Sequence, residues 1–290
     1  MSKTYAVRPE DVRGRTFAIT GANTGIGRVT AVEIARAGGQ VILACRSLER
    51  TQPVIDAIAA LPGAPPAAFV ALDLGSLDSV RACAARLLER PGPIHVLINN
   101  AGQAGLKGVT TEGFEAAFGI NHLGHFLLTL LLLPKLREAP GARVVTVASR
   151  AHKRTATFEL DGVQRPTRTA TGFPEYQVSK LANVLFSAEL ARRLEGTGVH
   201  TYALHPGVVA SDVWRKIPWP FRGLTRLFML SNEEGAATTL YCATAAEVAG
   251  DTGLYYDACR AVPTAPLGAD RGLARELWTR SLAWTGAADL

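Results

Sequence analysis

The sequence has no hydrophobic run long enough to cross a membrane. The longest apolar stretch, residues 126–133, is interrupted by Thr129 and ends at Pro134, whereas a transmembrane helix needs about 20 apolar residues. Residues 1–15 are polar and charged, which is not the pattern of a secretory signal peptide. We therefore expect a cytoplasmic protein with no transmembrane segment, in which residues 126–133 belong to a buried helix.

Cysteine is sparse and is not arranged for metal binding. The four cysteines, Cys45, Cys83, Cys242 and Cys259, include no Cys-x-x-Cys pair and have no histidine nearby at metal-ligand spacing. We expect no metal site, and we expect reduced thiols of the kind found in cytosolic proteins.

Clustered basic charge is also missing. The formal net charge is +6, but the arginines are scattered and no run of five or six basic residues occurs. Nucleic-acid binding needs a clustered basic patch. We therefore expect a solvated basic surface and no nucleic-acid partner.

The 290 residues contain no visible repeat and no interdomain linker. The most turn-rich stretch, residues 61–66, is too short to separate domains. Hydrophobic residues make up 48% and charged residues 19% of the chain, which suits a globular protein with a sizeable core. We expect one domain over residues 1–290.

Short apolar segments alternate with helical segments along most of the chain. Strand-like runs lie at residues 15–20, 40–45, 68–72, 94–98, 143–148, 199–204 and 253–256. Helices are expected at residues 29–37, 79–88, 111–136, 176–194, 233–245 and 273–282. Continuous apolar strands alternating with helices indicate a parallel sheet covered on both faces. The predicted fold class is α/β, a doubly wound Rossmann-type sheet of seven parallel strands.

A glycine-rich loop joins the first strand to the first helix. Gly21, Gly25 and Gly27 follow the spacing Gly-x-x-x-Gly-x-Gly. Gly21 permits a tight turn, Gly25 lets the backbone approach a pyrophosphate, and Gly27 allows close packing of helix on strand. The phosphates would bind amides at the helix N-terminus. The loop indicates dinucleotide binding, although a lone glycine loop can also serve only as a turn.

Arg46 follows the second strand, with Ser47 and Arg50 close behind and no carboxylate before Glu49. In dinucleotide folds an acidic residue at this point binds the ribose hydroxyls, whereas arginine suits a 2′-phosphate. The pattern favours NADP(H) over NAD(H), with a surface arginine as the alternative.

Polar residues follow the other strands of the predicted sheet. Asp73 follows the third strand, Asn99 to Gly102 the fourth, Ser149 the fifth, and His205, Pro206 and Gly207 the sixth. Because ligands bind at the carboxyl ends of strands in open α/β sheets, we expect these residues on one rim with the glycine loop.

Tyr176 and Lys180 are four residues apart in a predicted helix, and therefore lie on one face. An ammonium beside a phenol lowers the pKa of the phenol, and such a tyrosine can exchange a proton with a carbonyl or alcohol oxygen. The spacing alone also fits a half-buried tyrosine beside a solvated lysine. Asn121 lies inside an apolar helix, where its side chain needs hydrogen-bond partners.

Residues 208–230 alternate large apolar side chains with cations. They could cover a substrate pocket, lie on a membrane surface or pack in the core. We favour a substrate-covering insertion, which indicates a lipophilic substrate.

The ordered set of motifs resembles the short-chain dehydrogenase/reductase family over roughly residues 13–256. The motifs are the loop Thr20 to Gly27, Asp73, Asn99 to Gly102, Asn121, Ser149, the Tyr176–Lys180 pair and His205 to Gly207. Within that family the chain is similar to the retinol dehydrogenase-like branch. Residues 20–27, 44–46, 121–128, 179–186 and 205–209 carry this similarity, and the branch also has a long gap between its serine and tyrosine.

The resemblance implies a role for each motif residue. Tyr176 is the general acid or base, Lys180 lowers its pKa and binds the nicotinamide ribose, Ser149 hydrogen-bonds the reacting oxygen, and Asn121 holds a water in a proton relay to Lys180. With Arg46, the implied cofactor-binding residues are Gly21, Asn23, Thr24, Gly25, Ile26, Gly27, Asp73, Leu74, Asn100, Ala101, Gly102, Tyr176, Lys180, Pro206, Gly207, Val208, Val209 and Ser211.

Two departures from the family pattern stand out. The family often has threonine near the position of Ser211. Membrane-bound retinol dehydrogenases begin with an apolar anchor, whereas residues 1–15 are polar, so a soluble protein is expected and a retinoid is a less expected substrate.

The expected function is that of an NADP(H)-dependent oxidoreductase acting on a lipophilic aldehyde, ketone or alcohol. A homo-oligomer is compatible with this function. One alternative is reduction of an activated C=C bond, because protochlorophyllide reductases resemble this chain in fold, tyrosine and lysine. Another is a catalytically idle NADP(H)-sensing or scaffold protein. Proteins of that kind typically lose part of the catalytic set, which is complete here.

Overall fold

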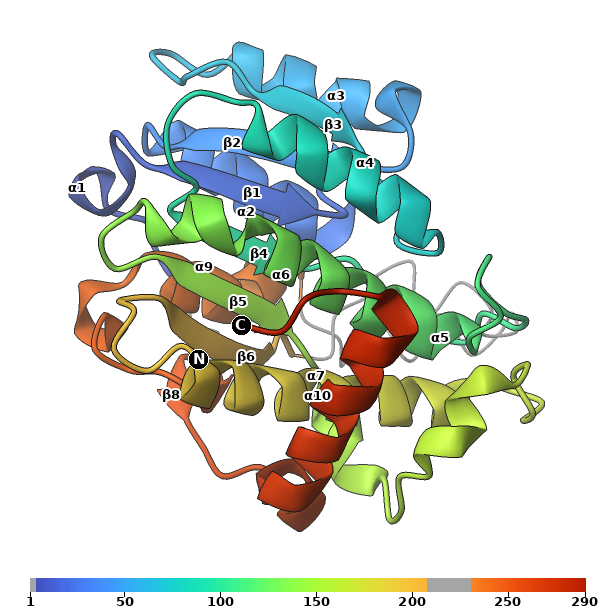
Figure 1. Cartoon of the computed structure of the whole chain (residues 1–290). Helices are drawn as coiled ribbons and strands as arrows, with labels where there is room; N and C mark the ends of the chain where they lie inside the picture. Colours follow the sequence, from blue (N-terminus) through green and yellow to red (C-terminus); the bar gives the residue numbers. More distant parts are fainter. Residues whose placement is uncertain (1–3, 208–230) are drawn as a thin grey trace.

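The protein is described by a computed structural model over residues 4–207 and 231–290, and is built around one sheet with the strand order β3-β2-β1-β4-β5-β6-β7-β8. Strands β1 to β7 are parallel, and β8 pairs antiparallel with β7 (Figure 1). The strands are β1 (Thr16–Thr20), β2 (Gln40–Cys45), β3 (Ala68–Ala71), β4 (Val96–Asn99), β5 (Arg143–Val147), β6 (His200–His205), β7 (Leu254–Asp257) and β8 (Arg260–Ala261). The predicted doubly wound parallel sheet is confirmed.

The sheet has one strand more than the predicted seven. The chain reverses after β7 at Ala258 and Cys259, whose φ angles are 49° and 58°, and the two residues of β8 then pair with Tyr256 and Asp257. Two consecutive residues with positive φ are typical of a tight hairpin turn. A turn without glycine or asparagine carries little sequence signal, which explains why this strand was not predicted.

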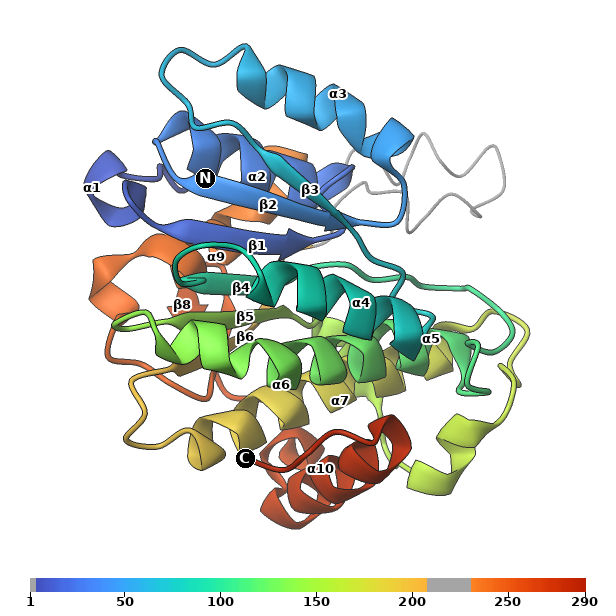
Figure 2. The ribbon, with the colours of Figure 1, turned by 45° about the horizontal axis from the view of Figure 1, so that its top comes forward.

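Helices cover both faces of the sheet (Figure 2). On one face lie α2 (Gly25–Arg36), α3 (Leu48–Ala59) and α9 (Asn232–Thr244). On the other lie α4 (Leu77–Leu88), α6 (Gly124–Arg137) and α7 (Phe173–Arg193), with α10 (Arg271–Thr285) packed on α7. The short elements are α1 (Pro9–Val12), α5 (Ala116–Phe118), η5 (Ala246–Val248) and η6 (Pro266–Ala269). Side chains alternate along β1 between the two layers, since Ala18 faces one and Phe17 and Ile19 face the other.

Helix α3 was not predicted. Ser47 caps its N-terminus by accepting a hydrogen bond from the Arg50 amide, and the helix buries Thr51, Val54 and Ile58. Pro53 lies inside this helix, and an interior proline ordinarily breaks a helical pattern. Burial of the apolar side therefore outweighs local propensity here.

The single helix predicted over residues 111–136 is divided. A π-helical turn, η1 (Gly119–Leu123), separates α5 from α6, and the Gly124 amide donates to the Gly119 carbonyl. Residues Ala116–Arg137 are long and apolar enough to span a membrane, but 89% of their most apolar window is buried inside the protein. This segment is therefore a core helix, as predicted for residues 126–133.

Residues 150–175, which lack a sequence pattern, contain two 3-10 helices, η2 (Arg150–Arg154) and η3 (Leu160–Gln164). The buried Glu115 accepts a hydrogen bond from the Thr167 hydroxyl (2.6 Å) and ties this connection to the segment before α5. The predicted insertion at residues 208–230 lies outside the described residues.

Candidate active site

A cleft of about 780 Å³ opens at the carboxyl ends of β1 to β4. Its lining includes twelve of the predicted cofactor-binding residues: Gly21, Asn23, Thr24, Gly25, Ile26, Gly27, Arg46, Asp73, Leu74, Asn100, Ala101 and Gly102. Strand order reverses between β1 and β4, and such a switch point is where doubly wound folds bind dinucleotides. The cleft is also lined by Ala44, Cys45, Ser47, Arg50, Leu72, Gln103, Ala104 and Ile120.

The glycine loop forms a cradle that larger residues would fill. Gly21 has φ 66°, and a Cβ there would lie 2.8 Å from the Cβ of Ala101. A Cβ on Gly27 would lie 2.4 Å from Nδ2 of Asn100. The lack of a side chain at Gly27 therefore leaves space for the Asn100 side chain as well as for helix α2. Within the part of the chain that the structure describes, the atom nearest to a Cβ on Gly25 would be Oδ1 of Asn232, at 3.9 Å. The backbone at Gly25 therefore faces open space at the N-terminus of α2, which suits a phosphate-binding group.

Thr20 and Asn100 hold the floor of the cleft in place. Nδ2 of Asn100 donates to the carbonyls of Thr20 (2.8 Å) and Gly21 (3.3 Å). The Thr20 hydroxyl accepts from the amides of Asn100 and Ala101, both at 3.0 Å. Thr20 was predicted to belong to the cofactor-loop motif, but no role was predicted for its side chain. Its position at the end of a buried strand was the feature from which a role for the hydroxyl could have been inferred.

Cations and one carboxylate border the open side of the cleft. Arg46 and Arg50 are exposed and line it together with Ser47. Oδ1 of Asp73 accepts from the Gly75 amide (2.9 Å), and the Asp73 amide donates to the Ser79 hydroxyl (2.9 Å). The cleft thus has two exposed positive side chains in its lining at the place where the sequence predicted a 2′-phosphate site.

The predicted catalytic residues lie beyond the Gly102 end of the cleft. A Cβ on Gly102 would lie 3.2 Å from Nζ of Lys180 and 3.5 Å from Oδ1 of Asn121. Lys180 is buried, and its Nζ donates to the carbonyl of Val147 at the end of β5 (2.8 Å). The amine and the amide therefore border directly on the cofactor cleft.

Tyr176 and Ser149 form the other half of this arrangement. The side chain of Ser149 lies close enough to the Tyr176 hydroxyl to lower the pKa of the phenol. Ser149 follows β5, where its Oγ also accepts from the Ala151 amide (3.1 Å). The hydroxyl pair can present two hydrogen-bonding groups to a single oxygen atom.

Burial has the largest effect on the pKa values of both Tyr176 and Lys180. It raises the pKa of Tyr176, an effect that the side chain of Ser149 opposes. It lowers the pKa of Lys180 to about 7. The resemblance also implies that Lys180 lowers the pKa of Tyr176, and this stays a prediction, because the groups that shift the pKa of Tyr176 here are its burial and the Ser149 side chain.

Asn121 is held on every side-chain atom that can form a hydrogen bond. Its Nδ2 donates to the Gln103 carbonyl and to the Ser179 hydroxyl, both at 2.9 Å, and its Oδ1 accepts from the Gln103 amide (2.8 Å). Ser179 in turn donates to the Tyr176 carbonyl (2.8 Å). Gln103 was not predicted as a site residue. No role was predicted for Ser179, although it directly precedes Lys180 in the sequence.

Other predicted site residues are not brought to the cleft. Pro206 and Gly207 follow β6 but do not line it, while Val208, Val209 and Ser211 lie outside the described residues. Within residues 4–207 and 231–290, no group of three or more His, Cys, Asp and Glu side chains is placed to hold a metal ion.

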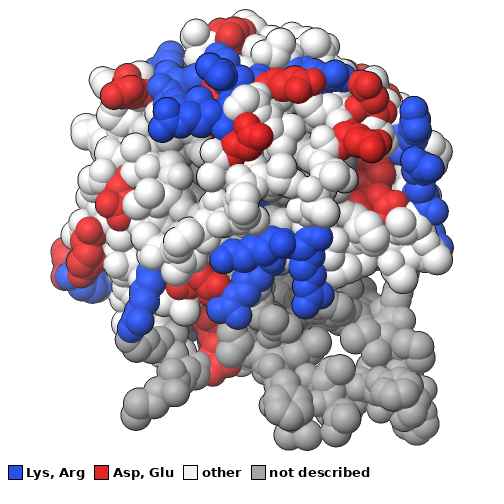
Figure 3. Space-filling model, turned by 90° about the horizontal axis from the view of Figure 1, so that it is seen from below, with Lys and Arg blue, Asp and Glu red and all other residues white. Residues whose placement is uncertain are grey.

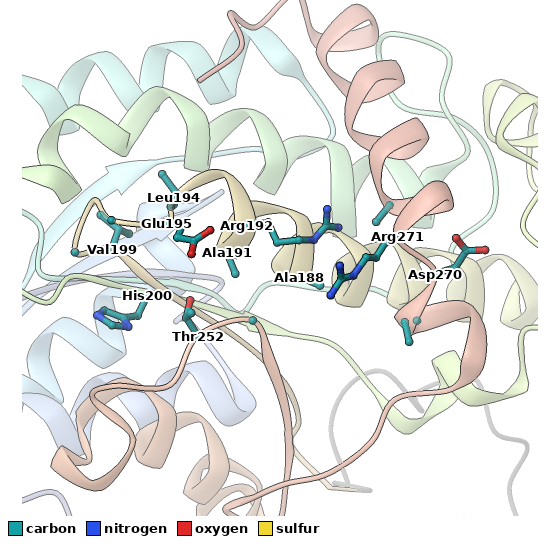
Figure 4. A pocket seen from close by; sticks show the side chains of 16 residues that line it. Ala188, Ala191, Arg192, Leu194, Glu195, Val199, His200, Thr252, Asp270 and Arg271 are labelled. Carbon is teal, nitrogen blue, oxygen red and sulfur yellow. The ribbon is translucent and has the colours of Figure 1, made fainter.

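A second hollow, of about 630 Å³, lies where α7 ends and β6 begins (Figure 4). Arg192, Glu195, Asp270 and Arg271 surround it with charges of both signs, and none of the predicted site residues that the structure describes lines it. His200 begins β6, so this hollow lies at the amino-terminal end of the strand. It is therefore separate from the candidate active site.

Surface charge gives no sign of a continuous basic stripe on the face in Figure 3. There Lys and Arg side chains form separate groups with Asp and Glu between them.

A doubly wound sheet with a glycine cradle, and with serine, tyrosine and lysine at its end, defines a nicotinamide-dependent oxidoreductase. The family model described as short chain dehydrogenase matches residues 15–160, and the chain belongs to this family. It is an oxidoreductase of the retinol dehydrogenase-like kind.

Individual relatives support this assignment over most of the chain. Retinol dehydrogenase 12 of Mus musculus is 42% identical over 274 residues, 93% of this chain and 86% of that protein. Dehydrogenase/reductase SDR family member 13 of Bos taurus is 42% identical over 289 residues, 96% of this chain and 75% of that protein. Among solved structures, an uncharacterised protein from Mycobacterium paratuberculosis has a TM-score of 0.77 and 32% identity, and covers 98% of both chains.

Proposed function

We propose that the protein transfers a hydride between NADP(H) and the carbonyl or alcohol carbon of a lipophilic small molecule, with Tyr176 as the proton donor or acceptor. The observation that carries this proposal is the position of Lys180 and Asn121 at the Gly102 end of the cleft, with Tyr176 one helical turn before Lys180 and Ser149 close to its phenol.

The residues of the cleft fit an NADP(H) molecule. The N-terminus of α2 and the cradle of Gly21, Gly25 and Gly27 suit its pyrophosphate. Arg46 and Arg50 are exposed cations, which suit a 2′-phosphate through charge-assisted hydrogen bonds. Bound nicotinamide would supply the hydride.

The protein residues would supply orientation and a proton. The hydroxyls of Ser149 and Tyr176 would hold the reacting oxygen, so that a carbonyl is polarised or an alcohol is aligned. During reduction Tyr176 gives its proton to that oxygen, and during oxidation it takes the proton back. Lys180, one helical turn further on, would stabilise the phenolate by its charge once it is protonated.

The lipophilic substrate class rests on two supports. Residues 214–229 combine tryptophan, phenylalanine and leucine with cations, and two relatives at about 40% identity are named retinol dehydrogenases. A long-chain or polyene alcohol or aldehyde is therefore the first substrate class to test.

The experiment replaces Tyr176 with Phe and measures turnover of hydrophobic aldehydes, ketones and alcohols by NADPH absorbance. We expect a loss of about 10²- to 10⁴-fold, the usual contribution of a general acid or base. Tyr202→Phe is the matched control, because its buried hydroxyl donates to Val248 and takes no part in the site. Near-wild-type turnover by the Tyr176 variant would refute the proton role.

The same assay separates the competing functions. An enone substrate reports C=C reduction if the product is a saturated ketone, and carbonyl reduction if it is an allylic alcohol. NADPH binding without turnover of any substrate would instead support a sensing or scaffold protein.

A further inference from the structure

His125 lies in the first turn of α6, fully enclosed by protein, and its two ring nitrogens contact two parts of the candidate site. Nε2 is 2.9 Å from the Thr20 hydroxyl at the end of β1. Nδ1 is 3.0 Å from the backbone carbonyl of Asn121 in the π-helical turn. The ring therefore bridges the floor of the cofactor cleft and the backbone of a predicted catalytic residue.

The partners of the ring determine where its proton lies. A carbonyl oxygen only accepts hydrogen bonds, so Nδ1 must carry the proton and donate it to Asn121. Nε2 of the neutral ring is then an acceptor. The Thr20 oxygen already accepts from the amides of Asn100 and Ala101. Its single hydroxyl hydrogen can be donated to Nε2 at 2.9 Å or to the Ile98 carbonyl at 3.4 Å, and Nε2 is the nearer acceptor. The Nδ1–H tautomer thus satisfies both contacts of the ring.

The surroundings keep the ring neutral and fixed. Burial lowers the pKa of His125 to about 4, and the charge of Lys180 acts in the same direction. The His125 carbonyl accepts from the Thr129 hydroxyl (2.7 Å), which accepts from Nδ2 of Asn99 at the end of β4 (2.9 Å). A doubly protonated ring would keep its donor to the Asn121 carbonyl, but its Nε2–H would be a third donor to the Thr20 oxygen, which already accepts from two amides.

The bridge acts on a part of Asn121 that its side-chain contacts do not hold. Gln103 and Ser179 fix the amide group, whereas His125 holds the backbone carbonyl. This carbonyl lies in a π-helical turn, and such turns interrupt the regular ladder and often occur at functional sites. The ring therefore donates a side-chain hydrogen bond to a carbonyl within that turn.

We propose that His125, as the neutral Nδ1–H tautomer, is a positioning residue that couples the cofactor-binding turn at Asn100 and Ala101 to the backbone of Asn121. Through Asn121 it sets the alignment of Lys180 and Tyr176 with the bound cofactor. This inference rests on the proposed function for the roles of Asn121 and Lys180. The tautomer of His125 and its coupling to cofactor binding can be measured without any turnover.

The first test is the tautomer itself. Long-range ¹H–¹⁵N spectra of the histidine-labelled protein, with His125→Gln used to assign the signal, distinguish Nδ1–H from Nε2–H in a neutral ring. We expect the Nδ1–H pattern at neutral pH. An Nε2–H pattern would overturn the proposal whatever the enzyme turns over.

The second test separates the two contacts by substitution. His125→Asn keeps an amide donor near the position of Nδ1 and loses the Thr20 contact, while His125→Gln places its amide near Nε2 and loses the Asn121 contact. Thr20→Val removes the hydroxyl, and Thr20→Ser restores it. We expect weaker NADPH binding in Thr20→Val and His125→Asn. The double variant should bind no more weakly than Thr20→Val alone, which also removes the acceptor of the Asn100 and Ala101 amides. Additive losses in the double variant would refute the coupling.

The third test uses turnover with a matched histidine. His122 lies one turn earlier, is equally buried, and contacts Ser281 through Nε2 (3.2 Å) with no contact to the site. We expect His125→Gln to lower kcat about 10- to 100-fold, as misplacement of catalytic groups does, with little change in substrate KM. His122→Gln should lower stability while it keeps kcat near wild type. Equal losses of kcat in both variants would mean that His125 is only a core residue.

Discussion

Nζ of Lys180 lies 5.7 Å from the centre of the Tyr176 ring and donates its hydrogen bond to the carbonyl of Val147, not to the phenol. The lysine therefore cannot hand a proton directly to the tyrosine in this arrangement. It can act on Tyr176 through its charge, and that charge depends on whether the buried amine is protonated.

We predict that Lys180→Met lowers kcat by about 10²- to 10⁴-fold, the scale of a lost acid–base function, because it removes the charge that favours the phenolate. Lys180→Arg should also lose most activity, since the enclosed site that accepts a compact ammonium beside Val147 does not suit a planar guanidinium. Rates measured across pH in both directions test this. Lys135→Met, a change at a lysine that pairs with Glu138 on α6, is the control and should keep wild-type kcat.

We predict that Arg46→Ala weakens NADPH binding about 10- to 100-fold, which corresponds to the loss of one charged hydrogen bond, and leaves NADH binding almost unchanged. Fluorescence titration of the two cofactors measures this selectivity. Arg36→Ala is the matched control, because Arg36 pairs with Glu33 on α2 and does not line the cleft. Equal losses for NADPH and NADH would show that Arg46 does not contact the 2′-phosphate.

We predict that Gly27→Ala destabilises the protein by roughly 1–3 kcal/mol, the usual cost of overpacking, and weakens binding of either cofactor. The added Cβ would lie 2.4 Å from Nδ2 of Asn100 and 2.6 Å from the Gly21 carbonyl, so the floor of the cleft must move. Gly250→Ala adds the same atom where no other atom lies within 4 Å and should be close to neutral. Chemical unfolding of both variants measures the change in stability, and cofactor titration measures the change in affinity.

We predict that the free energy of unfolding falls as pH falls from about 6.5 toward 4. Burial lowers the pKa of His122 to about 3 and the pKa values of His125 and His205 to about 4, whereas an unfolded histidine has a pKa near 6.5. Within this window the unfolded chain binds more protons than the folded protein, so each histidine contributes a slope of up to about 1.4 kcal/mol per pH unit.

Urea unfolding at several pH values checks the slope, and His122→Gln should make it shallower because one of the three groups is removed. An unchanged slope in that variant would show that His122 does not titrate abnormally. The expected direction is opposite to that of a histidine stabilised by a carboxylate, whose pKa is raised.

The cofactor cleft was predictable because chain order and strand ends suffice to assemble it. Once β1 to β4 are parallel, the segments after them must meet at one rim, which brings Gly21, Arg46, Asp73 and Asn100 together. The same reasoning placed Ser149 on that rim. These positions depend on backbone topology, which hydrophobic patterns encode well.

Features that depend on side-chain hydrogen bonds between distant segments were not predictable. The contacts of His125 with Thr20 and of Asn121 with Gln103 join residues far apart in sequence. Apolar periodicity also does not distinguish a π-helical turn at residues 119–123 from an α-helix. Residues 150–175 are held by the hydrogen bond from Thr167 to Glu115, and such a contact leaves no periodic pattern in the sequence.

The hairpin at Ala258 and Cys259 has a consequence for assembly. Its return strand β8 pairs with Tyr256 and Asp257, and the Val262 amide donates to the Tyr255 carbonyl (2.8 Å). Among the described strands, the outermost on this side is thus only two residues long, a common protection of sheets against edge-to-edge association. So short a strand offers a second copy few backbone groups with which to extend the sheet at this border.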